Sequence, residues 1–569
     1  MHDDVKLAGD RTLTVPPHTG HNVLSDLPFF EKLLRFAHRR PPLLAIRDVN
    51  AGVEKSYLQL LSDALTLRKA LKGSLGPEIQ QDLEDDNEVY IALIAPGGYE
   101  YAVAFIAILA LGAAVVPITT ALPPQEAKSL VERAQCAAIL SSSDGTARIL
   151  TNGVLDALHA KPPHLTIATY LLSTPLHPST ILISSNPSPD LNAPALVIFT
   201  TGTTGPPKGA VQRRSYITSA AEDVATHYRL SENDTVLHSL PVHHATGIGV
   251  TFLPFLVVGA TIEFRSGSFD ASWVWERFRR DGITVFSGVP TIYMRLRRFF
   301  DEHISGLREA EREEYIAGAR RLRILLCGTS ALPDPVQRFW TSILAGRTIL
   351  TRYGGTEFHT VLKAAIDGSS PANSVGKVSP GVDLKLSSEG EILLRSPLLF
   401  SKYLHDPLAT KNAHDEQGYY RTGDIARRSG ENYYILGRAS LDIIKSGGYK
   451  LSALDIEREI LGLEYVSEVM VVGVEDEEFG QRVGAVVVLK GEDKSGSGLS
   501  LERLRGDLRG FLAGYKMPTL LRVVEGEIPK SGTGKVQKSV LGPRYFSKQW
   551  RGDRDVQVWK RQVRKKAKL

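Results

Sequence analysis

Along most of the chain, apolar and polar positions follow two periodicities, one typical of helices and one typical of strands. The helical spacing is clear at 29–40 (FFEKLLRFAHRR) and 56–71 (SYLQLLSDALTLRKAL). Short apolar runs between helical segments predict buried strands at 89–95, 195–199, 260–264, 283–289 and 322–328. Strands that alternate with helices predict an α/β fold of layered sheets and helices.

One apolar stretch, Tyr101–Ile118, is long enough to be compared with a membrane span. Gly112 and Pro117 interrupt it, and the adjacent Val115 and Val116 favour a strand. We therefore predict a buried helix over 101–111, a turn, and then a buried strand, with no membrane span. The N-terminal MHDDVKLAGD lacks the apolar segment of a signal peptide.

The pattern changes near Gly437 and Arg438. About a hundred residues follow that alternate helix and strand on their own, which predicts a separate, small α+β domain. Its expected segments are 452–463 (helix), 466–474 (strand), 482–490 (strand), 501–512 (helix) and 520–528 (strand). The predicted division is an N-terminal arm (1–25), a large domain (26–438), a mobile small domain (439–544) and a basic tail (545–569). A proline-rich stretch at 159–194 predicts a long surface connection.

Composition is that of a globular protein, with 43% hydrophobic and 23% charged residues among 569. The net charge of +5 comes from the end of the chain, where residues 544–569 hold ten Lys/Arg against two Asp. The rest holds 58 Lys/Arg and 61 Asp/Glu, so a nucleic-acid-binding surface is not expected. Only Cys136 and Cys327 are present, which excludes a disulfide framework.

The strongest chemical motif is Phe199–Ala210, FTTGTTGPPKGA, directly after a predicted strand. Two glycines allow a tight turn with inward N–H groups, and threonine hydroxyls and a lysine add donors and charge, which together suit a polyphosphate. Lys208 is followed by Gly209, so this is not a Walker A loop. The motif's candidate ligands are Thr200, Thr201, Gly202, Thr203, Thr204, Gly205 and Lys208.

With this motif the chain resembles the adenylate-forming superfamily of acyl-CoA synthetases, peptide-synthetase adenylation domains and luciferases. Four further motifs follow in the family's order, so the resemblance extends from about Leu27 to about Gly542: TRYGGTE (351–357), YRTGD (420–424), GRASLDIIKSGGYKLSALDIE (437–457) and IPKSGTGKVQK (528–538). The resemblance implies a large ATP- and acid-binding adenylation domain, a mobile C-terminal lid, and ATP, Mg²⁺ and CoA as cofactor and substrates.

The resemblance also implies the nucleotide ligands. Tyr353 would stack on adenine, Glu357 and Thr203 would hold Mg²⁺, and Asp424, helped by Arg438, would bind ribose. Gly355 stands where the family usually has Met. Lys535 would bridge the acid's carboxylate and the α-phosphate during adenylation, so Lys535, Thr203 and Glu357 are the predicted catalytic residues. The remaining predicted nucleotide ligands are Thr329, Arg352, Gly354 and Thr356.

For the second step the resemblance implies that the Gly447–Gly448 loop lines the pantetheine tunnel, with Lys445 and Lys450 nearby. The hinge position, usually Asp or Lys, is Ser440 here. A small residue there can still absorb a domain rotation.

The acid is expected to lie against 241–247, 287–295 and 328–331, with His244, Gly288, Arg295 and Thr329 as ligands. The strings HHATG, VPTIY and DIIKSGGYKLSALDIE resemble the malonyl-CoA synthetase branch most. A dicarboxylate has a second carboxylate that needs a charged partner. Arg295 is the candidate, and Arg338 a weaker one. If both arginines point outward, a medium-chain or aromatic acid becomes the better hypothesis.

Other interpretations stay open. The chain could load a carrier protein, act as a luciferase-like oxygenase, or bind a nucleotide without catalysis. The last three residues, Ala567-Lys568-Leu569, approximate a peroxisomal signal, which predicts an import receptor as partner and a peroxisomal, otherwise cytoplasmic, location.

Overall fold

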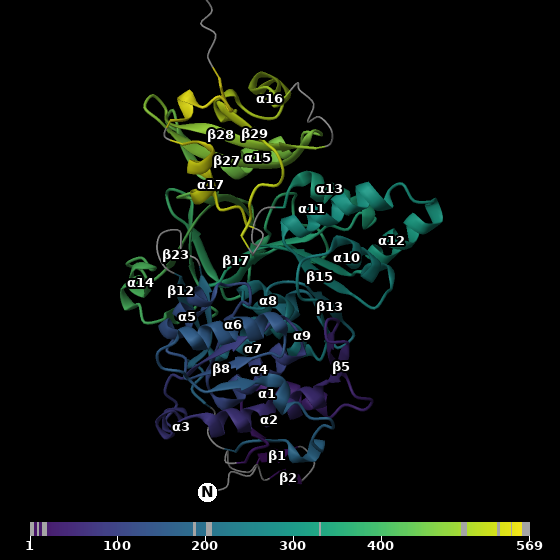
Figure 1. Ribbon diagram of the computed structural model, residues 1–569. Helices are drawn as coiled ribbons and strands as arrows, with labels where there is room; N and C mark the ends of the chain where they lie inside the picture. The colour runs from purple at the N-terminus through teal and green to yellow at the C-terminus, as the bar shows by residue number, and fades with distance from the viewer. Residues whose placement is uncertain are drawn as a thin grey trace, which may run out of the picture.

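A computed structural model describes residues 5–7, 11–13, 20–185, 189–200, 207–328, 332–490, 498–531, 535–547 and 549–559. Three larger sheets form most of a large domain, and a six-stranded sheet forms a small domain that lies at the top of the view in Figure 1. The predicted α/β class is confirmed. Among the helices of the described residues, none combines the length and apolar character that a bilayer crossing requires.

The two largest sheets of the large domain are mostly parallel. In spatial order the seven-stranded sheet consists of β22 (Lys402–Tyr403), β12 (Lys208–Arg213), β11 (Pro194–Thr200), β7 (Ala114–Ile118), β6 (Tyr90–Ile94), β8 (Ala138–Ser141) and β9 (His164–Thr166). The nine-stranded sheet consists of β19 (Lys377–Val378), β18 (His359–Lys363), β17 (Leu350–Gly355), β16 (Ile324–Cys327), β15 (Val285–Gly288), β13 (Thr235–His238), β14 (Thr261–Phe264), β4 (Leu44–Asp48) and β5 (Val53–Ser56).

One hydrophobic core lies between these sheets and contains residues from both. The helices that fill it are α1 (Pro28–Ala37), α2 (Tyr57–Ser74), α4 (Tyr99–Leu111), α7 (Arg214–His227), α8 (Ala245–Thr251) and α9 (Leu253–Val258). The helix α4 and strand β7 confirm the predicted buried helix and strand, because Gly112 (φ +92°) ends the helix in the left-handed conformation. The apolar run is therefore core.

Each large sheet is covered by helices on its outer face as well. The outer face of the seven-stranded sheet packs on α5 (Pro124–Arg133) and α6 (Gly145–Ala157). The outer face of the nine-stranded sheet packs on α10 (Ala271–Arg279), α11 (Pro290–Phe299), α12 (Glu309–Arg321) and α13 (Asp334–Ile343). Two peripheral helices are α3 (Pro77–Glu84) and α14 (Pro407–Asn412).

A four-stranded antiparallel sheet completes the large domain and contributes its last two strands to the site. It consists of β20 (Asp383–Leu386), β21 (Glu391–Arg395), β23 (Tyr420–Ser429) and β24 (Asn432–Arg438). The small domain begins just beyond it. Its sheet consists of β26 (Tyr449–Ser452), β25 (Ile443–Ser446), β28 (Gly480–Leu489), β29 (Leu520–Val524) and β30 (Val556–Val558), with β27 (Val466–Asp476) also on β28, and its helices are α15 (Ala453–Leu461), α16 (Leu501–Asp507) and α17 (Lys538–Tyr545).

The chain end differs from the expected tail. Strand β30 pairs antiparallel with β29, and Trp550 and Val556 are buried in a small-domain core. Residues 549–559 therefore belong to the small domain, because their alternating apolar side chains close one end of its sheet.

Part of the N-terminal arm also forms strands and contacts the large domain. Strands β1 (Val5–Leu7) and β2 (Arg11–Leu13) pair with each other, and β3 (Val23–Leu24) pairs with β10 (Leu182–Ile183). Buried Arg68 donates to the carbonyl oxygens of His21 and Val23. Residues 21–24 are thus fixed to the core, and the 159–194 connection supplies β9 and β10.

Candidate active site

Asp424 lies on β23 between two partners that fix its carboxylate. Tyr353 on β17 donates its hydroxyl to Oδ2 at 2.8 Å, and Arg438 Nε donates to Oδ1 at 3.1 Å. Arg438 is directly opposite Asp424 in the antiparallel β23–β24 pair. Burial raises the pKa of Asp424, while Arg438 and Tyr353 oppose that rise and favour the carboxylate. A fixed carboxylate of this kind can accept hydrogen bonds from two neighbouring hydroxyl groups.

Glu357, just beyond β17, accepts a hydrogen bond from Tyr403 at 3.0 Å. Lys208 lies 5.1 Å from the centre of the Tyr403 ring. On the next strand, Thr200 is paired with Lys208 and donates to its carbonyl oxygen at 3.3 Å. The structure therefore brings the first and second motifs together around Tyr403, a residue that sequence reasoning missed.

Lys535 reaches this site from the small domain. Burial lowers the pKa of Lys535, and so does the positive charge of Arg438. The carboxylates of Asp424 and Glu357 raise it. All three groups are therefore within electrostatic range of the Lys535 ammonium. The residue as a whole is exposed to solvent. One lysine near two carboxylates and one arginine forms a site of mixed charge suited to anionic and metal-bound groups.

Two histidines flank the expected acid position. The rings of His243 and His244 lie 4.3 Å apart between centres. Burial lowers the pKa of His243 to about 3 and that of His244 to about 4, with Lys535 adding to the effect on His244. Both imidazoles are neutral near pH 7, so they can donate or accept a hydrogen bond there.

The strand β17 sends its side chains alternately to opposite faces. Tyr353 points to Asp424, whereas Arg352 is on the other face, buried and 7% exposed. Arg352 was predicted to bind the nucleotide, and its side chain lies on the face of β17 away from Asp424. Gly354 is required because a Cβ there would lie 2.2 Å from the His359 carbonyl oxygen. The Thr356 carbonyl oxygen accepts from Gln212 at 2.6 Å.

The two arginines proposed for the acid's second carboxylate both face the small domain. Arg295 is 43% exposed in its side chain and pairs with Glu527 at 3.5 Å. Arg338 is exposed and lines a groove with residues 461–464 of the small domain. Because α11 and α13 bury their apolar faces on the sheet, these arginines lie on the opposite faces. We therefore do not assign the second carboxylate to either one. Gly288, also predicted to contact the acid, is the last residue of β15.

The predicted CoA loop is a tight turn between β25 and β26. Gly447 and Gly448 have φ values of +55° and +85°, which side-chain-bearing residues rarely adopt. Lys445 is paired across the hairpin with Lys450, which forms an ion pair with Glu389 at 3.1 Å. The loop thus has no side chains at its two glycines and positive charge beside them.

The remaining predicted ligands lie outside the described residues. These are Thr201, Gly202, Thr203, Thr204, Gly205 and Thr329, together with the C-terminal Ala567, Lys568 and Leu569.

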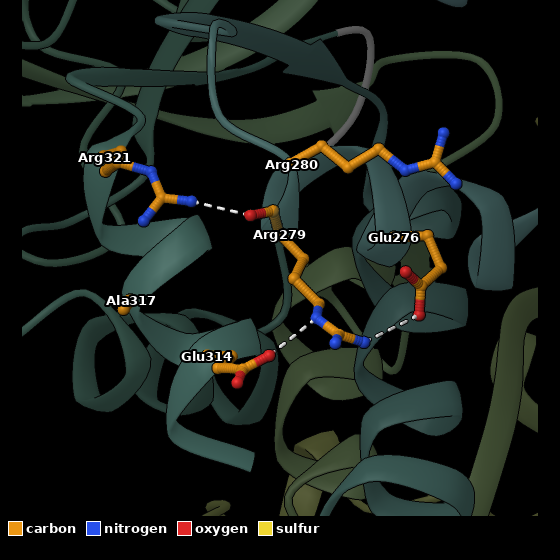
Figure 2. Close-up of a pocket in the computed structure, with 6 residues that line it drawn as sticks. All are labelled: Glu276, Arg279, Arg280, Glu314, Ala317 and Arg321. Carbon is orange, nitrogen blue, oxygen red and sulfur yellow. Dashed lines mark hydrogen bonds and ion pairs between the residues drawn. The ribbon is translucent and has the colours of Figure 1, made fainter. Parts of the chain in front are cut away.

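A surface hollow between α10 and α12 is lined by charged side chains. Figure 2 shows Arg279 between two of them, 2.9 Å from Glu314 and 3.6 Å from Glu276, whereas the Arg280 side chain has no hydrogen bond or ion pair with the residues drawn. Arg321 donates to the Arg279 carbonyl oxygen at 2.8 Å.

Comparison with known proteins agrees with this geometry. The family model for AMP-binding enzymes matches residues 33–404, and the model of their C-terminal domain matches 455–535. The chain belongs to the AMP-binding enzyme family. This AMP-binding enzyme is an ATP-dependent, AMP-forming acid–CoA ligase, with a large N-terminal and a smaller C-terminal domain.

Several relatives of this AMP-binding enzyme match over most of their length. It is 34% identical to the mitochondrial malonate–CoA ligase of Xenopus laevis, over 88% of this chain and 90% of that protein. It is 32% identical to the malonate–CoA ligase of Arabidopsis thaliana, over 86% of this chain and 84% of that protein. Among solved structures, ATP-bound MatB from Rhodopseudomonas palustris matches with a TM-score of 0.76 and 25% identity, over 92% of this chain and 99% of that one. None of these relatives is described as peroxisomal, so the predicted location gains no support.

Proposed function

We propose that this ligase activates malonate or a similarly small dicarboxylate. Its relatives named for malonate motivate the choice of acid. The observation that carries the chemistry is the position of Lys535, delivered by the small domain into electrostatic range of Glu357 and Asp424 in the large one. This arrangement suits the first half-reaction, in which two anions must approach each other.

Mg²⁺ fits the residues present at Glu357. Mg²⁺ bound with ATP is usually held by one or two carboxylates together with phosphates and water, not by a closed protein cage. Glu357 supplies such a carboxylate, with Tyr403 orienting Oε1. Within the described residues, no group of three or more His, Cys, Asp or Glu could hold a metal ion without the nucleotide. The ion would offset phosphate charge when bound.

In the first step, Asp424 holds the ribose and Lys208 and the preceding loop hold the phosphates. Lys535 offsets the charge of the approaching carboxylate and the α-phosphate, so the acid oxygen can attack phosphorus and pyrophosphate can leave. Neutral His244 lies near Lys535 and is placed to hydrogen-bond the acid.

In the second step, the small domain rotates at Ser440 so that the Gly447–Gly448 loop replaces Lys535 at the site. The sulfur of CoA then attacks the acyl carbon, and AMP leaves. The rotation moves Lys535 away, since this lysine acts only in the first step. It brings in the Gly447–Gly448 turn, whose lack of side chains leaves space for the pantetheine arm. Closure also excludes water, which would hydrolyse the adenylate.

A second candidate acid is favoured by one observation. Arg295 and Arg338 both face the small domain, so neither offers a dicarboxylate its second partner. On that basis alone, a medium-chain or aromatic acid would be preferred.

The proposal is tested by acid-dependent exchange of labelled pyrophosphate into ATP. Malonate should stimulate exchange, chelation of the metal should abolish it, and added Mg²⁺ should restore it. Exchange that octanoate or coumarate stimulates and malonate does not would reject the dicarboxylate. Exchange that survives complete chelation would reject the role of Glu357 as a metal ligand.

A further inference from the structure

The helix α11 presents two arginines to one carboxylate of the small domain. Arg295 Nη2 lies 3.5 Å from Glu527 Oε2, and Arg298 Nη1 lies 3.7 Å from Glu527 Oε1. Residues three apart on a helix share a face, so the two guanidinium groups are neighbours and each is paired with a different oxygen. Glu527 is therefore held between two cations of the other domain.

Glu527 immediately precedes the segment that carries Lys535, and this segment is fixed to the small domain. The Ile528 N–H donates to Glu468 Oε2 at 3.0 Å, and the Lys530 ammonium donates to Oε1 of the same carboxylate at 2.7 Å. Ile528 is 1% exposed and belongs to a small-domain core. A contact on Glu527 therefore acts on the small domain as a whole.

The loop of Lys535 closes on the same segment. Lys530 is paired with Val536 in an isolated antiparallel bridge, and the Ser531 N–H donates to the Lys535 carbonyl oxygen at 2.8 Å. These bonds fix the point at which the Lys535 side chain leaves the small domain. Whatever holds residues 527–531 against the large domain therefore also positions the Lys535 ammonium.

The ion pairs of Glu527 join parts of the chain that lie on either side of the proposed hinge. Both arginines precede Ser440, whereas Glu527 follows it. A second pair has the same arrangement: Lys450 of the small domain lies 3.1 Å from Glu389, in the turn between β20 and β21 of the large domain. Rotation of the small domain at Ser440 therefore separates both sets of partners.

We infer that Glu527 is a positioning residue for Lys535, and that its pairs with Arg295 and Arg298 hold the small domain in the orientation for adenylate formation. The inference rests on the role proposed for Lys535. Exposed ion pairs contribute little to folding stability, and the side chains of Arg295, Glu527 and Arg298 are 43%, 47% and 60% exposed. A small contribution is sufficient between two orientations that are both adopted in every cycle, because a modest difference in free energy changes their ratio several-fold.

The test compares Glu527→Gln with the wild-type enzyme in the two half-reactions. Gln retains the shape of the side chain and removes its charge. Adenylate formation from saturating ATP and malonate should slow about 5-fold, because two exposed ion pairs that favour its orientation are lost. Thioester formation from a supplied acyl-adenylate should be unchanged or faster. Rapid-quench measurement gives both rates, and if another acid supports pyrophosphate exchange better than malonate, the same comparison is made with that acid.

Glu302→Gln is the matched control. Glu302 is paired with the same Arg298 at 3.8 Å and is similarly exposed, but it belongs to the large domain. Both rates of this variant should stay within about 2-fold of wild type. If Glu527→Gln does not fold, Arg298→Gln decides by the same two rates, with adenylate formation about 2-fold slower and thioester formation not slowed.

Salt and charge reversal separate positioning from a merely structural role. Salt screens exposed ion pairs, so the wild-type-to-Glu527→Gln ratio of adenylation rates should fall from about 5 toward 1 as NaCl rises from about 0.05 M to 0.5 M. Glu527→Arg should slow adenylate formation further, and adding Arg298→Glu in the same chain should restore part of the rate. A structural defect would instead lower the Tm and would not be rescued by the second substitution.

Equal slowing of both half-reactions in Glu527→Gln would overturn the inference while leaving the ligase function intact. An equal effect of Glu302→Gln, or a rate ratio that does not change with salt, would overturn it as well. Lys535→Ala tests the underlying proposal separately: if that variant does not slow adenylate formation selectively, the role of Lys535 fails first, and the inference fails with it.

Discussion

The ammonium of Lys538 lies 2.6 Å from Asp442 Oδ1, which joins the segment that carries Lys535 to the segment that follows Arg438. Glu457 on α15 accepts from the same ammonium at 2.8 Å. Its two carboxylates raise the pKa of Lys538 against the effect of burial, so the lysine is charged. The Arg438 backbone N–H also donates to Asp442, at 3.0 Å. The loop of Lys535 is thus held against the hinge region.

Replacing Lys538 should destabilise the small domain. Lys538→Met leaves two buried carboxylates without their cation, so the free energy of unfolding should fall by about 3–5 kcal/mol. Urea unfolding followed by the fluorescence of Trp550 and Trp559 measures this. Lys377→Met is the control, because the Lys377–Glu431 pair is equally short, at 2.6 Å, but exposed, and its loss should cost under about 1 kcal/mol. Equal effects of the two substitutions would contradict the buried network.

Lys535→Ala should separate the two half-reactions. Adenylate formation should fall by about 10³-fold or more, because the developing charge loses its preorganised cation. Thioester formation from a supplied acyl-adenylate should stay within about 3-fold, since Lys535 serves only the first step. Rapid-quench measurement of each step distinguishes the two. Equal loss in both steps would remove the role assigned to Lys535.

Asp424 and Tyr353 should act on the nucleotide and not on the acid. Asp424→Ala should raise the KM for ATP about 100-fold, because a buried carboxylate that accepts two hydroxyl groups is lost. Tyr353→Phe removes one hydrogen bond to Asp424 and should raise it only about 5- to 10-fold. Steady-state kinetics with ATP and malonate varied in turn provide the measurement. A change confined to the KM for malonate would place Asp424 elsewhere.

Buried histidines should make the protein less stable in acid. Burial lowers the pKa of His238 to about 4, although its ring donates to the Gly247 carbonyl oxygen. Between pH 6.5 and about 4 the unfolded chain binds a proton at His238 that the folded protein does not. The stability contribution is therefore complete above pH 6.5 and is lost as the pH falls through this window.

The expected loss from His238 is about 2–3 kcal/mol between pH 6.5 and 4.5. His238→Gln can keep the donor to Gly247 and should flatten the pH dependence of the unfolding free energy by that amount. Exposed His303→Gln is the matched control and should leave the curve unchanged. A curve for His238→Gln that is parallel to wild type would show that His238 does not set the acid limit.

Much of the fold could be predicted because its patterns are local. The strands expected at 89–95 and 322–328 appear as β6 and β16, since continuous apolar runs next to helices are typical of buried parallel strands. The predicted helix 501–512 was too long: α16 ends at Asp507, before Gly510 and exposed Phe511. Local patterns do not fix where an element ends, because tertiary contacts decide it.

The site was predicted only as far as its motifs extend. Asp424 and Lys535 were named from motifs, and the structure brings them together across two domains. Tyr403 was missed because no local signal marks a tyrosine whose role depends on a distant glutamate. The orientation of Arg352 could have been predicted, since neighbours on a strand alternate in direction and Tyr353 was already assigned to the nucleotide. For Lys538, the only sequence signal of a role near the site was its position three residues after Lys535 in the same motif.

The most direct test of the central claim is CoA-thioester formation, followed by mass spectrometry with ATP and Mg²⁺ across six acids. The panel contains malonate, methylmalonate, succinate, oxalate, octanoate and coumarate. We expect malonyl-CoA to form fastest, with AMP and pyrophosphate released in equal amounts. Preference for octanoate or coumarate would contradict the dicarboxylate assignment. Pyrophosphate release without any thioester would contradict CoA as the acceptor.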